Sequence, residues 1–295
     1  MPAPIATYQP ERIEDAIALL AEHGDGAKVV AGGTALAILL RQGLIQPTAL
    51  VSIGKLPALD AIRRENGELF LGALVTHREV ERSALVRGTI PGLARAFEVV
   101  ANVRVRNAAT VGGVMAEADY ASDPPAVFLG LDAVIVAEGP AGVRRIPAAE
   151  FFVAFYETSL QRDEIVTGVD VPIPPAGTGT HYEKFVTRSS EDRPCVGVFA
   201  AARPDGAGGF TDVRVAVGAA AEIPQRFADL EALGAGTDLS PDVCRAIADG
   251  YAERIETLDD VRGSAWYRTE MIRVWVRRAL ERARANAAGT AGAAA

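Results

Sequence analysis

The chain has 295 residues, of which 49% are hydrophobic, and a formal net charge of −8. This length and hydrophobic content favour two domains over one. The acidic balance argues against nucleic-acid binding, which needs a basic surface. No apolar run approaches the roughly 18 residues of a membrane span.

The cysteines and histidines are too few and too scattered for a metal centre. Cys195 and Cys244 are the only thiols, whereas an iron–sulfur cluster of this kind takes four thiolates. Two thiols also favour a reducing cytoplasm over a disulfide framework. His23, His77 and His181 lack ligand spacing, so we expect no zinc or iron site.

The first third of the chain predicts alternating short strands and helices. Apolar positions at helical spacing predict a helix from Glu11 to about His23, and not a signal peptide. The further elements expected before the glycine-rich centre are strands at 28–30, 50–53 and 69–74, a helix ending near Gly43, and helices over 78–85 and 92–100.

The centre, residues 102–125, predicts a strand, a glycine turn and a loop. Val103 and Val105 alternate with Arg104 and Arg106, which is typical of a half-buried strand. Further on we expect a helix after Asp123, a strand over 131–137 with a hairpin turn, strands over 181–188, 197–203 and 211–218 in an antiparallel sheet, and helices over 225–233, 241–255 and 265–285.

Two pairs of adjacent glycines each follow an apolar segment. Gly32 and Gly33 come between the strand at 28–30 and an apolar helix, and Gly112 and Gly113 follow Thr110. Adjacent glycines leave backbone N–H groups uncovered, so that they can converge on an anion. Thr34 is expected to cap the helix after the first pair. Two such turns indicate a cofactor with a pyrophosphate, although an ordinary tight turn is the alternative at each.

With these motifs the chain resembles the FAD-binding medium subunit of the molybdenum hydroxylases, such as xanthine dehydrogenase and aerobic carbon monoxide dehydrogenase. The resemblance covers nearly the whole chain. The motifs that carry it are AGGT at Ala31–Thr34, VRN and ATVGG within Val105–Gly113, Asp119 and Asp123, IPAAEFF at Ile146–Phe152, the set Lys184, Arg188 and Asp192, and RALER at Arg278–Arg282.

The resemblance implies an α+β fold. It consists of a two-part FAD-binding domain of the vanillyl-alcohol-oxidase-like type, followed by a C-terminal α+β domain with an antiparallel sheet and helices. We expect the first domain at 1–175, with subdomains at about 1–56 and 57–175, because prolines and glycines cluster at 171–179. The second domain is expected at 180–285, and the Ala/Gly-rich residues 286–295 as a disordered tail.

The resemblance also implies the residues that bind the cofactor. Residues 30–36 and 110–114 are expected around the pyrophosphate and ribityl, Asp123 near the ribityl and ring, Ile165 against a ring, and Lys184 at the isoalloxazine, with Asp119 as a further cofactor-binding residue. The individual residues are Val30, Ala31, Gly32, Gly33, Thr34, Ala35, Leu36, Thr110, Gly112, Gly113, Val114, Asp119, Asp123, Ile165 and Lys184.

Several of these residues also have ordinary structural explanations. Asp123 precedes a proline, as a helix N-cap does. Lys184 on an exposed strand is usually a solvated charge, and Ile165 fits a buried strand. Two residues depart from the family pattern: Val114 replaces a common Asn or Ser, and Tyr120 replaces a frequent proline.

The function that the resemblance implies is electron transfer through non-covalent FAD, since no histidine adjoins either glycine pair in the sequence. A large molybdopterin-binding subunit and a small iron–sulfur subunit are the implied partners, in a dimer of heterotrimers in the cytoplasm. This chain then needs no catalytic acid, base or nucleophile. The alternatives are a free-standing FAD-dependent oxidoreductase with its own substrate pocket, or a flavin-free assembly subunit.

Overall fold

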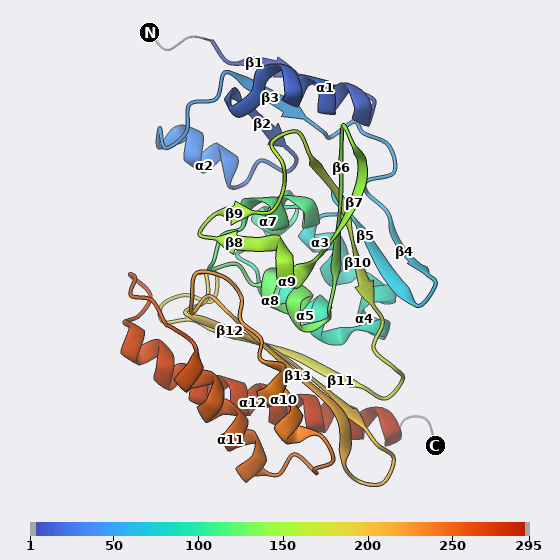
Figure 1. The fold of residues 1–295 in the computed structure, drawn as a ribbon, viewed down its shortest axis with the longest axis vertical. Coiled ribbons are helices and arrows are strands. Elements are labelled where there is room, and N and C mark those ends of the chain that lie inside the picture. The colour runs from blue at the N-terminus through green and yellow to red at the C-terminus, as the bar shows by residue number, and fades with distance from the viewer. Residues whose placement is uncertain (1–3, 293–295) are drawn as a thin grey trace.

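Three sheets of three or more strands follow one another down the long axis of the molecule (Figure 1). The structure is a computed structural model that describes the backbone of residues 4–292 and the side chains of residues 4–287. The N-terminal part lies at one end, the middle part in the centre and the C-terminal part at the other end.

The N-terminal part is a small parallel sheet in the order β1-β3-β2, packed against helix α1. Leu20 of α1 and Val51 of β3 are buried in the same cluster. Helix α2 joins β2 to β3, as the sequence predicts. The bounds are β1 Ala6–Tyr8, α1 Ile13–His23, β2 Ala27–Val30, α2 Leu36–Arg41 and β3 Ala49–Ser52.

The middle part is an antiparallel sheet in the order β4-β5-β10-β6-β7, covered by short helices. Its strands are β4 Ile62–Glu65, β5 Glu68–Gly72, β6 Val134–Gly139, β7 Gly142–Pro147 and β10 Ile165–Pro172. Its helices are α3 His77–Arg82, α4 Ala84–Thr89, α5 Pro91–Glu98, α6 Val103–Arg106, α7 Val111–Glu117, α8 Pro124–Gly130 and α9 Ala148–Phe151. A small hairpin, β8 Phe152–Ala154 and β9 Glu157–Thr158, lies beside α7 (Figure 1).

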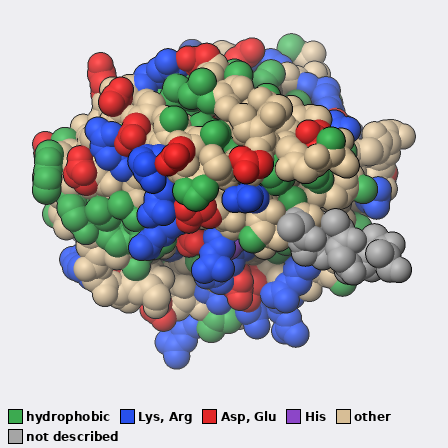
Figure 2. All heavy atoms as spheres, turned by 90° about the horizontal axis from the view of Figure 1, so that it is seen from below, with side chains coloured by type: hydrophobic (Ala, Val, Ile, Leu, Met, Phe, Trp, Pro, Cys, Tyr) green, Lys and Arg blue, Asp and Glu red, His purple; other side chains and the backbone are tan. Residues whose placement is uncertain are grey.

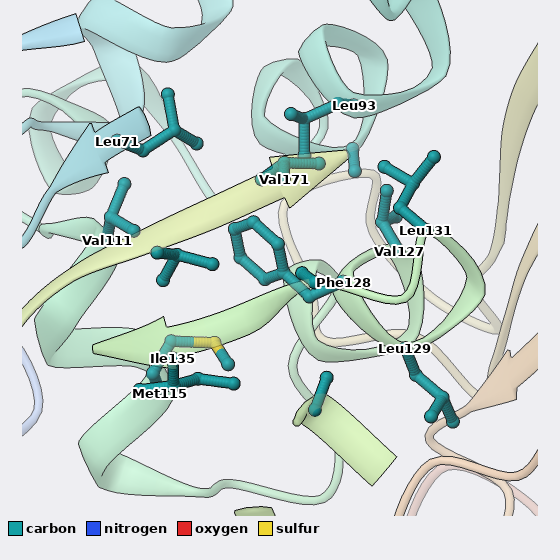
Figure 3. Packing of buried hydrophobic residues seen from close by; sticks show 14 of the residues in the cluster. Leu71, Leu93, Val111, Met115, Val127, Phe128, Leu129, Leu131, Ile135 and Val171 are labelled. Carbon is teal, nitrogen blue, oxygen red and sulfur yellow. The ribbon is translucent and has the colours of Figure 1, made fainter. Parts of the chain in front are cut away.

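The core of the middle part forms where its helices meet the sheet. Figure 3 shows Phe128 of α8 among side chains from several elements, with Met115 of α7 close to Ile135 of β6. All three side chains have no exposed surface. This core fixes the ends of α7 and α8, and therefore the turn 118–123 that joins them.

The C-terminal sheet is buried on both faces. Its strands are β11 Gly179–Phe185, β12 Val196–Pro204 and β13 Phe210–Gly218, all antiparallel. Phe199 and Ala201 belong to the core of the middle part, while Val198 and Ala200 belong to the core under α11 and α12. Because alternate residues point to opposite faces, β12 is almost wholly apolar, and one continuous core joins the two parts.

Three C-terminal helices follow: α10 Ala228–Glu231, α11 Pro241–Arg254 and α12 Ala265–Gly292. The helix expected over 225–233 is shorter than predicted, and the last helix is longer. Residues 286–292 are helical in the structure, where we expected a disordered tail. Residues 293–295 of that tail lie outside the described residues.

The prediction of a strand at Val103–Arg106 is wrong, because these residues form α6. The Asn102 side chain accepts hydrogen bonds from the backbone N–H groups of Arg104 (3.1 Å) and Val105 (3.2 Å). This cap satisfies the first N–H groups of a helix, so a local hydrogen bond overrides the strand-like alternation.

The surface at the C-terminal end carries basic and acidic side chains side by side (Figure 2). Arg273 of α12 lies 2.8 Å from Asp249 of α11, and Arg277 lies 2.9 Å from Glu281. Such pairs make this a mixed, solvated surface and not a patch of one sign. No helix in the described part of the chain is long and apolar enough to cross a membrane.

Candidate cofactor site

The first glycine pair forms a loop whose backbone N–H groups are free. Gly33 has a φ of 69°, a conformation that glycine adopts without strain. Within the described part of the chain, the N–H groups of residues 32–36 have no hydrogen-bond acceptor. Five consecutive free donors suit a phosphate or another anion. The prediction that Thr34 caps α2 is wrong, since α2 begins after Ala35 with no side-chain cap.

The second glycine pair does not form the predicted loop turn. It lies in the first helical turn of α7. Thr110 caps this helix, and its hydroxyl accepts the N–H of Gly113 (3.1 Å). The N–H of Gly112 donates to Ala73 O (2.9 Å), and a Cβ on Gly112 would lie 2.6 Å from the Ala73 Cβ. Gly112 therefore serves internal packing, and this pair lacks the row of free N–H groups that the sequence suggested.

The two glycine segments touch each other. A Cβ on Gly32 would lie 1.7 Å from Ala108 O, so only glycine allows this approach. His77 lies beside the second segment. Its backbone N–H donates to Ala109 O (2.8 Å), and its ring packs edge-on against Phe97. The sequence does not indicate that His77 lies near the second glycine pair, because the two are more than 30 residues apart. Burial lowers the pKa of His77 to about 4, so its ring is neutral at physiological pH.

Asp123 and Lys184 form a buried ion pair between the middle and C-terminal parts. Lys184 Nζ lies 3.0 Å from Asp123 Oδ2, and the two side chains are 6% and 4% exposed. Lys184 also donates to Val99 O (2.8 Å), and Tyr182 donates to Asp123 Oδ1 (2.8 Å). Asp123 occupies the N-cap position of α8, but its side chain makes no cap hydrogen bond. The interpretation of Lys184 as a solvated charge is wrong, because its side chain is buried.

Tyr182 is a site residue that the sequence analysis missed. It lies two residues before Lys184 on β11, and both side chains point to the same face of the strand. A Cβ on Gly197 would lie 2.3 Å from the Tyr182 hydroxyl, so this glycine leaves room for the phenol to reach Asp123. The period of two along the strand was the signal that could have found Tyr182.

The Asp123 carboxyl predicts a specific dependence of stability on pH. Burial raises its pKa to about 6, against the opposing effects of Lys184 and Tyr182. Between about pH 4, near the ordinary value of 3.8, and pH 6, the folded chain holds a proton that the unfolded chain has released. This contribution to stability is therefore present below pH 4 and is lost as the pH rises through 6.

We expect the free energy of unfolding of the wild-type chain, relative to Asp123→Asn, to fall by roughly 2 kcal/mol between pH 4 and pH 7. Urea unfolding of both chains across this range measures it. Asp60→Asn, at an exposed position, is the control and should follow the wild type. Parallel curves for wild type and Asp123→Asn would contradict the assignment.

Asp119 forms a second ion pair with the C-terminal part. Its Oδ2 lies 2.6 Å from Arg193 Nη2, and its Oδ1 accepts from Ala121 N (3.0 Å) and Tyr156 Oη (3.3 Å). Partial burial and the Asp119 charge raise the pKa of Tyr156 to about 12, so this phenol stays protonated and donates. Arg193 was not predicted as a site residue, because an arginine in a polar loop is usually exposed to solvent.

The remaining predicted residues lie near the first glycine loop or near the two ion pairs. Ile165, at the start of β10, is 2% exposed and belongs to the N-terminal cluster, against which Ala31 packs. Val114 packs half-buried against the middle core. Tyr120 donates to Asp260 Oδ2 (2.8 Å) and accepts from Arg262 Nη1 (3.0 Å). The predicted residues therefore form two groups, one at the first glycine loop and one at the two ion pairs, with α7 between them.

Two family models match consecutive parts of the chain. Residues 3–174 match the FAD binding domain in molybdopterin dehydrogenase, and residues 181–283 match the CO dehydrogenase flavoprotein C-terminal domain. The chain belongs to the FAD-binding subunits of the molybdenum hydroxylases. This family has the two-domain fold seen here, an FAD-binding domain followed by a C-terminal domain.

Individual members of the molybdenum hydroxylase family match over almost the full length. The carbon monoxide dehydrogenase medium chain of Hydrogenophaga pseudoflava is 32% identical over 95% of this chain and 97% of its own. The nicotine 6-hydroxylase medium subunit of Paenarthrobacter nicotinovorans is 33% identical, over 97% and 100%. The structure of a Hydrogenophaga pseudoflava carbon monoxide dehydrogenase that lacks the Mo-pyranopterin moiety has a TM-score of 0.93, with 34% identity, over 97% and 99%.

The residues of the first glycine loop fit the cofactor that this family binds. FAD carries a pyrophosphate, and the loop offers free N–H donors beside Gly32, where any larger residue would clash. The cysteines are two buried free thiols, and the described residues contain no cluster of three or more His, Cys, Asp or Glu side chains suited to a metal.

Proposed function

We propose that this chain binds FAD non-covalently and passes electrons from the iron–sulfur clusters of a partner subunit to an external acceptor. The observation that carries the proposal is the row of free N–H groups at residues 32–36, in a segment matched by the FAD-binding family model. These donors hold the pyrophosphate. Bound FAD supplies hydride and single-electron chemistry, and the chain binds and orients it.

The pair of Asp123 and Lys184 lies at the flavin end of the site in this proposal. The Lys184 ammonium is fixed by Asp123 and by Val99 O, so a positive charge is held in place without reorganisation. Such a charge favours the electron-rich form of the ring. The Tyr182 hydroxyl donates a hydrogen bond to the other carboxylate oxygen of Asp123. No acid, base or nucleophile of this chain has a catalytic role in the proposal.

At the other end, the partly buried Ala31 forms an apolar wall beside the first glycine loop and is backed by the cluster that contains the buried Ile165. This wall suits one face of a ring of the cofactor. Asp119 lies between the ends, in the turn after α7. The Thr110 hydroxyl oxygen accepts the N–H of Gly113 with one of its two lone pairs, and its hydrogen is available for donation. We propose these roles from the contacts above and from the family resemblance.

The assembly that we propose is a dimer of heterotrimers in the cytoplasm, with a large molybdopterin-binding subunit and a small iron–sulfur subunit. Two observations support the partner subunits: the medium-chain relatives, and the finding that no three His, Cys, Asp or Glu side chains of the described residues are grouped to hold a metal ion. Two free, buried thiols are consistent with a reducing compartment.

The experiment that tests the assembly is purification from the native source, with an absorbance spectrum and metal analysis of the same sample. We expect flavin bands overlaid by iron–sulfur absorption, with molybdenum present. A chain that elutes alone, with flavin but no iron or molybdenum, would instead support the free-standing flavoenzyme.

A further inference from the structure

Two ion pairs anchor the loop 186–195 between β11 and β12, one near each end. Lys184 lies just before this loop and pairs with Asp123, while Arg193 lies near its other end and pairs with Asp119. Both aspartates belong to the turn 118–123 between α7 and α8. Two cations of the C-terminal part therefore hold two carboxylates of the middle part, four residues apart.

The Arg193 pair is strongly asymmetric in exposure. The Arg193 side chain is 52% exposed, but the Asp119 side chain is only 1% exposed. Burial of a carboxylate is costly unless it is paired, and Arg193 is its ion-pair partner within the described residues. An ordinary surface pair has two exposed partners and contributes about 0–1 kcal/mol. Removing Arg193 would instead leave a buried charge.

The loop between these two anchors contacts segments next to the pair of Asp123 and Lys184. Glu191 accepts from Asn102 Nδ2 (3.4 Å), close in sequence to Val99, whose carbonyl accepts from Lys184. Near the other end of the loop, Arg193 forms an ion pair with Asp119. The loop thus contacts the segments on both sides of the pair Asp123 and Lys184.

We propose that Arg193 is a positioning residue that clamps the loop 186–195 over the flavin end of the FAD site by pairing with Asp119. This inference rests on the proposed function, because the flavin end is assigned there. Arg193 acts through Asp119 and the loop. The clamp slows FAD release, since the ring leaves only when the loop opens.

The first test follows the loop without the cofactor. In limited trypsin digestion of the full chain freed of FAD, Arg193→Ala should expose cleavage after Arg188, in the same loop, at least tenfold faster than wild type. Arg193 precedes a proline and is not itself a good tryptic site, so the variant removes none. Arg193→Lys should restore most of the protection, because it keeps a cation.

The second test follows FAD release from the complex by the fluorescence of free flavin. Arg193→Ala and Asp119→Asn should each release FAD at least tenfold faster, and the double variant no faster than the singles. The control is Arg145→Ala: its side chain is 53% exposed and lies 2.6 Å from a mostly buried Asp170, away from this loop. This variant should release FAD at the wild-type rate.

The outcomes separate the clamp from the proposed function. If the wild-type complex holds FAD and Arg193→Ala neither exposes Arg188 nor speeds release, the clamp is wrong and the FAD function stands. Faster release in Arg145→Ala, equal to that of Arg193→Ala, would also overturn it, by indicating general destabilisation. If the wild-type complex holds no FAD, the proposed function fails and the clamp fails with it.

Discussion

Replacing Lys184 by methionine is expected to lower the free energy of unfolding of the chain by about 3–5 kcal/mol at pH 9, where protonating Asp123 instead is itself costly because burial raises its pKa only to about 6. Methionine keeps most of the length of the side chain but removes the charge. Asp123 is then a buried carboxylate with Tyr182 as its side-chain donor, and leaving a buried charge unpaired is far costlier than breaking a surface pair. Urea unfolding of the full chain, followed by tryptophan fluorescence, measures the change.

The matched control is the double variant Lys184→Met with Asp123→Asn. It removes both charges, and the new amide oxygen can still accept from Tyr182. We expect the double variant to be more stable than the sum of the two single changes predicts, by at least about 1 kcal/mol. A loss below about 1 kcal/mol in Lys184→Met alone, as for an exposed pair, would contradict the buried pair that joins the two parts of the molecule.

The second large effect is expected at Gly32. Gly32→Ala places a Cβ 1.7 Å from Ala108 O, a distance that only a backbone shift can relieve. Because this shift separates the two glycine segments, we expect a loss of about 1–3 kcal/mol in stability and at least roughly tenfold weaker FAD binding, which corresponds to about 1.4 kcal/mol. Titration of the FAD-free protein with FAD, followed by flavin fluorescence, measures the affinity.

Gly88→Ala is the control for Gly32→Ala. Gly88 lies in α4, and a Cβ there would have nothing within 4 Å. Alanine in a helix is more favourable than glycine by roughly 1 kcal/mol, so this variant should be as stable as wild type or more so, with unchanged FAD affinity. Equal FAD affinity in Gly32→Ala and Gly88→Ala would remove the first glycine loop from the proposed site.

The sequence predicted much of the fold because most of its elements are defined by local patterns. The succession of β2, α2 and β3 follows from a strand, a glycine pair and an apolar helix. The hairpin of β12 and β13 follows from a tight turn between two apolar runs. Val103–Arg106 was misjudged because the same alternation fits a strand, and the Asn102 cap decides for a helix.

The candidate site was only partly predictable, since its decisive contacts join residues far apart in the chain. Asp119 and Arg193 are separated by 74 positions, and nothing near Arg193 in the sequence distinguishes it from a solvated arginine. The two glycine pairs look alike as motifs, but only the three-dimensional structure reveals that one has free N–H groups while those of the other are satisfied by Ala73 and Thr110. Hydrogen-bond partners across the fold are not encoded locally.

Val114, where the family commonly has Asn or Ser, cannot donate or accept a side-chain hydrogen bond, and this departure is what favours the flavin-free alternative. In the structure Val114 packs against the middle core, and the free donors lie instead at residues 32–36. A missing polar side chain at position 114 therefore leaves the main anion-binding segment intact, which supports the FAD-binding function over the assembly role.

The most direct test of the central claim is the amount and attachment of FAD in the purified complex. We predict close to one FAD per copy of this chain, all of it released into the supernatant when acid precipitates the protein. A complex that carries molybdenum and iron but less than about a tenth of one FAD per chain, and that takes up none from excess FAD, would contradict the account. Flavin that stays with the precipitated chain would contradict non-covalent binding.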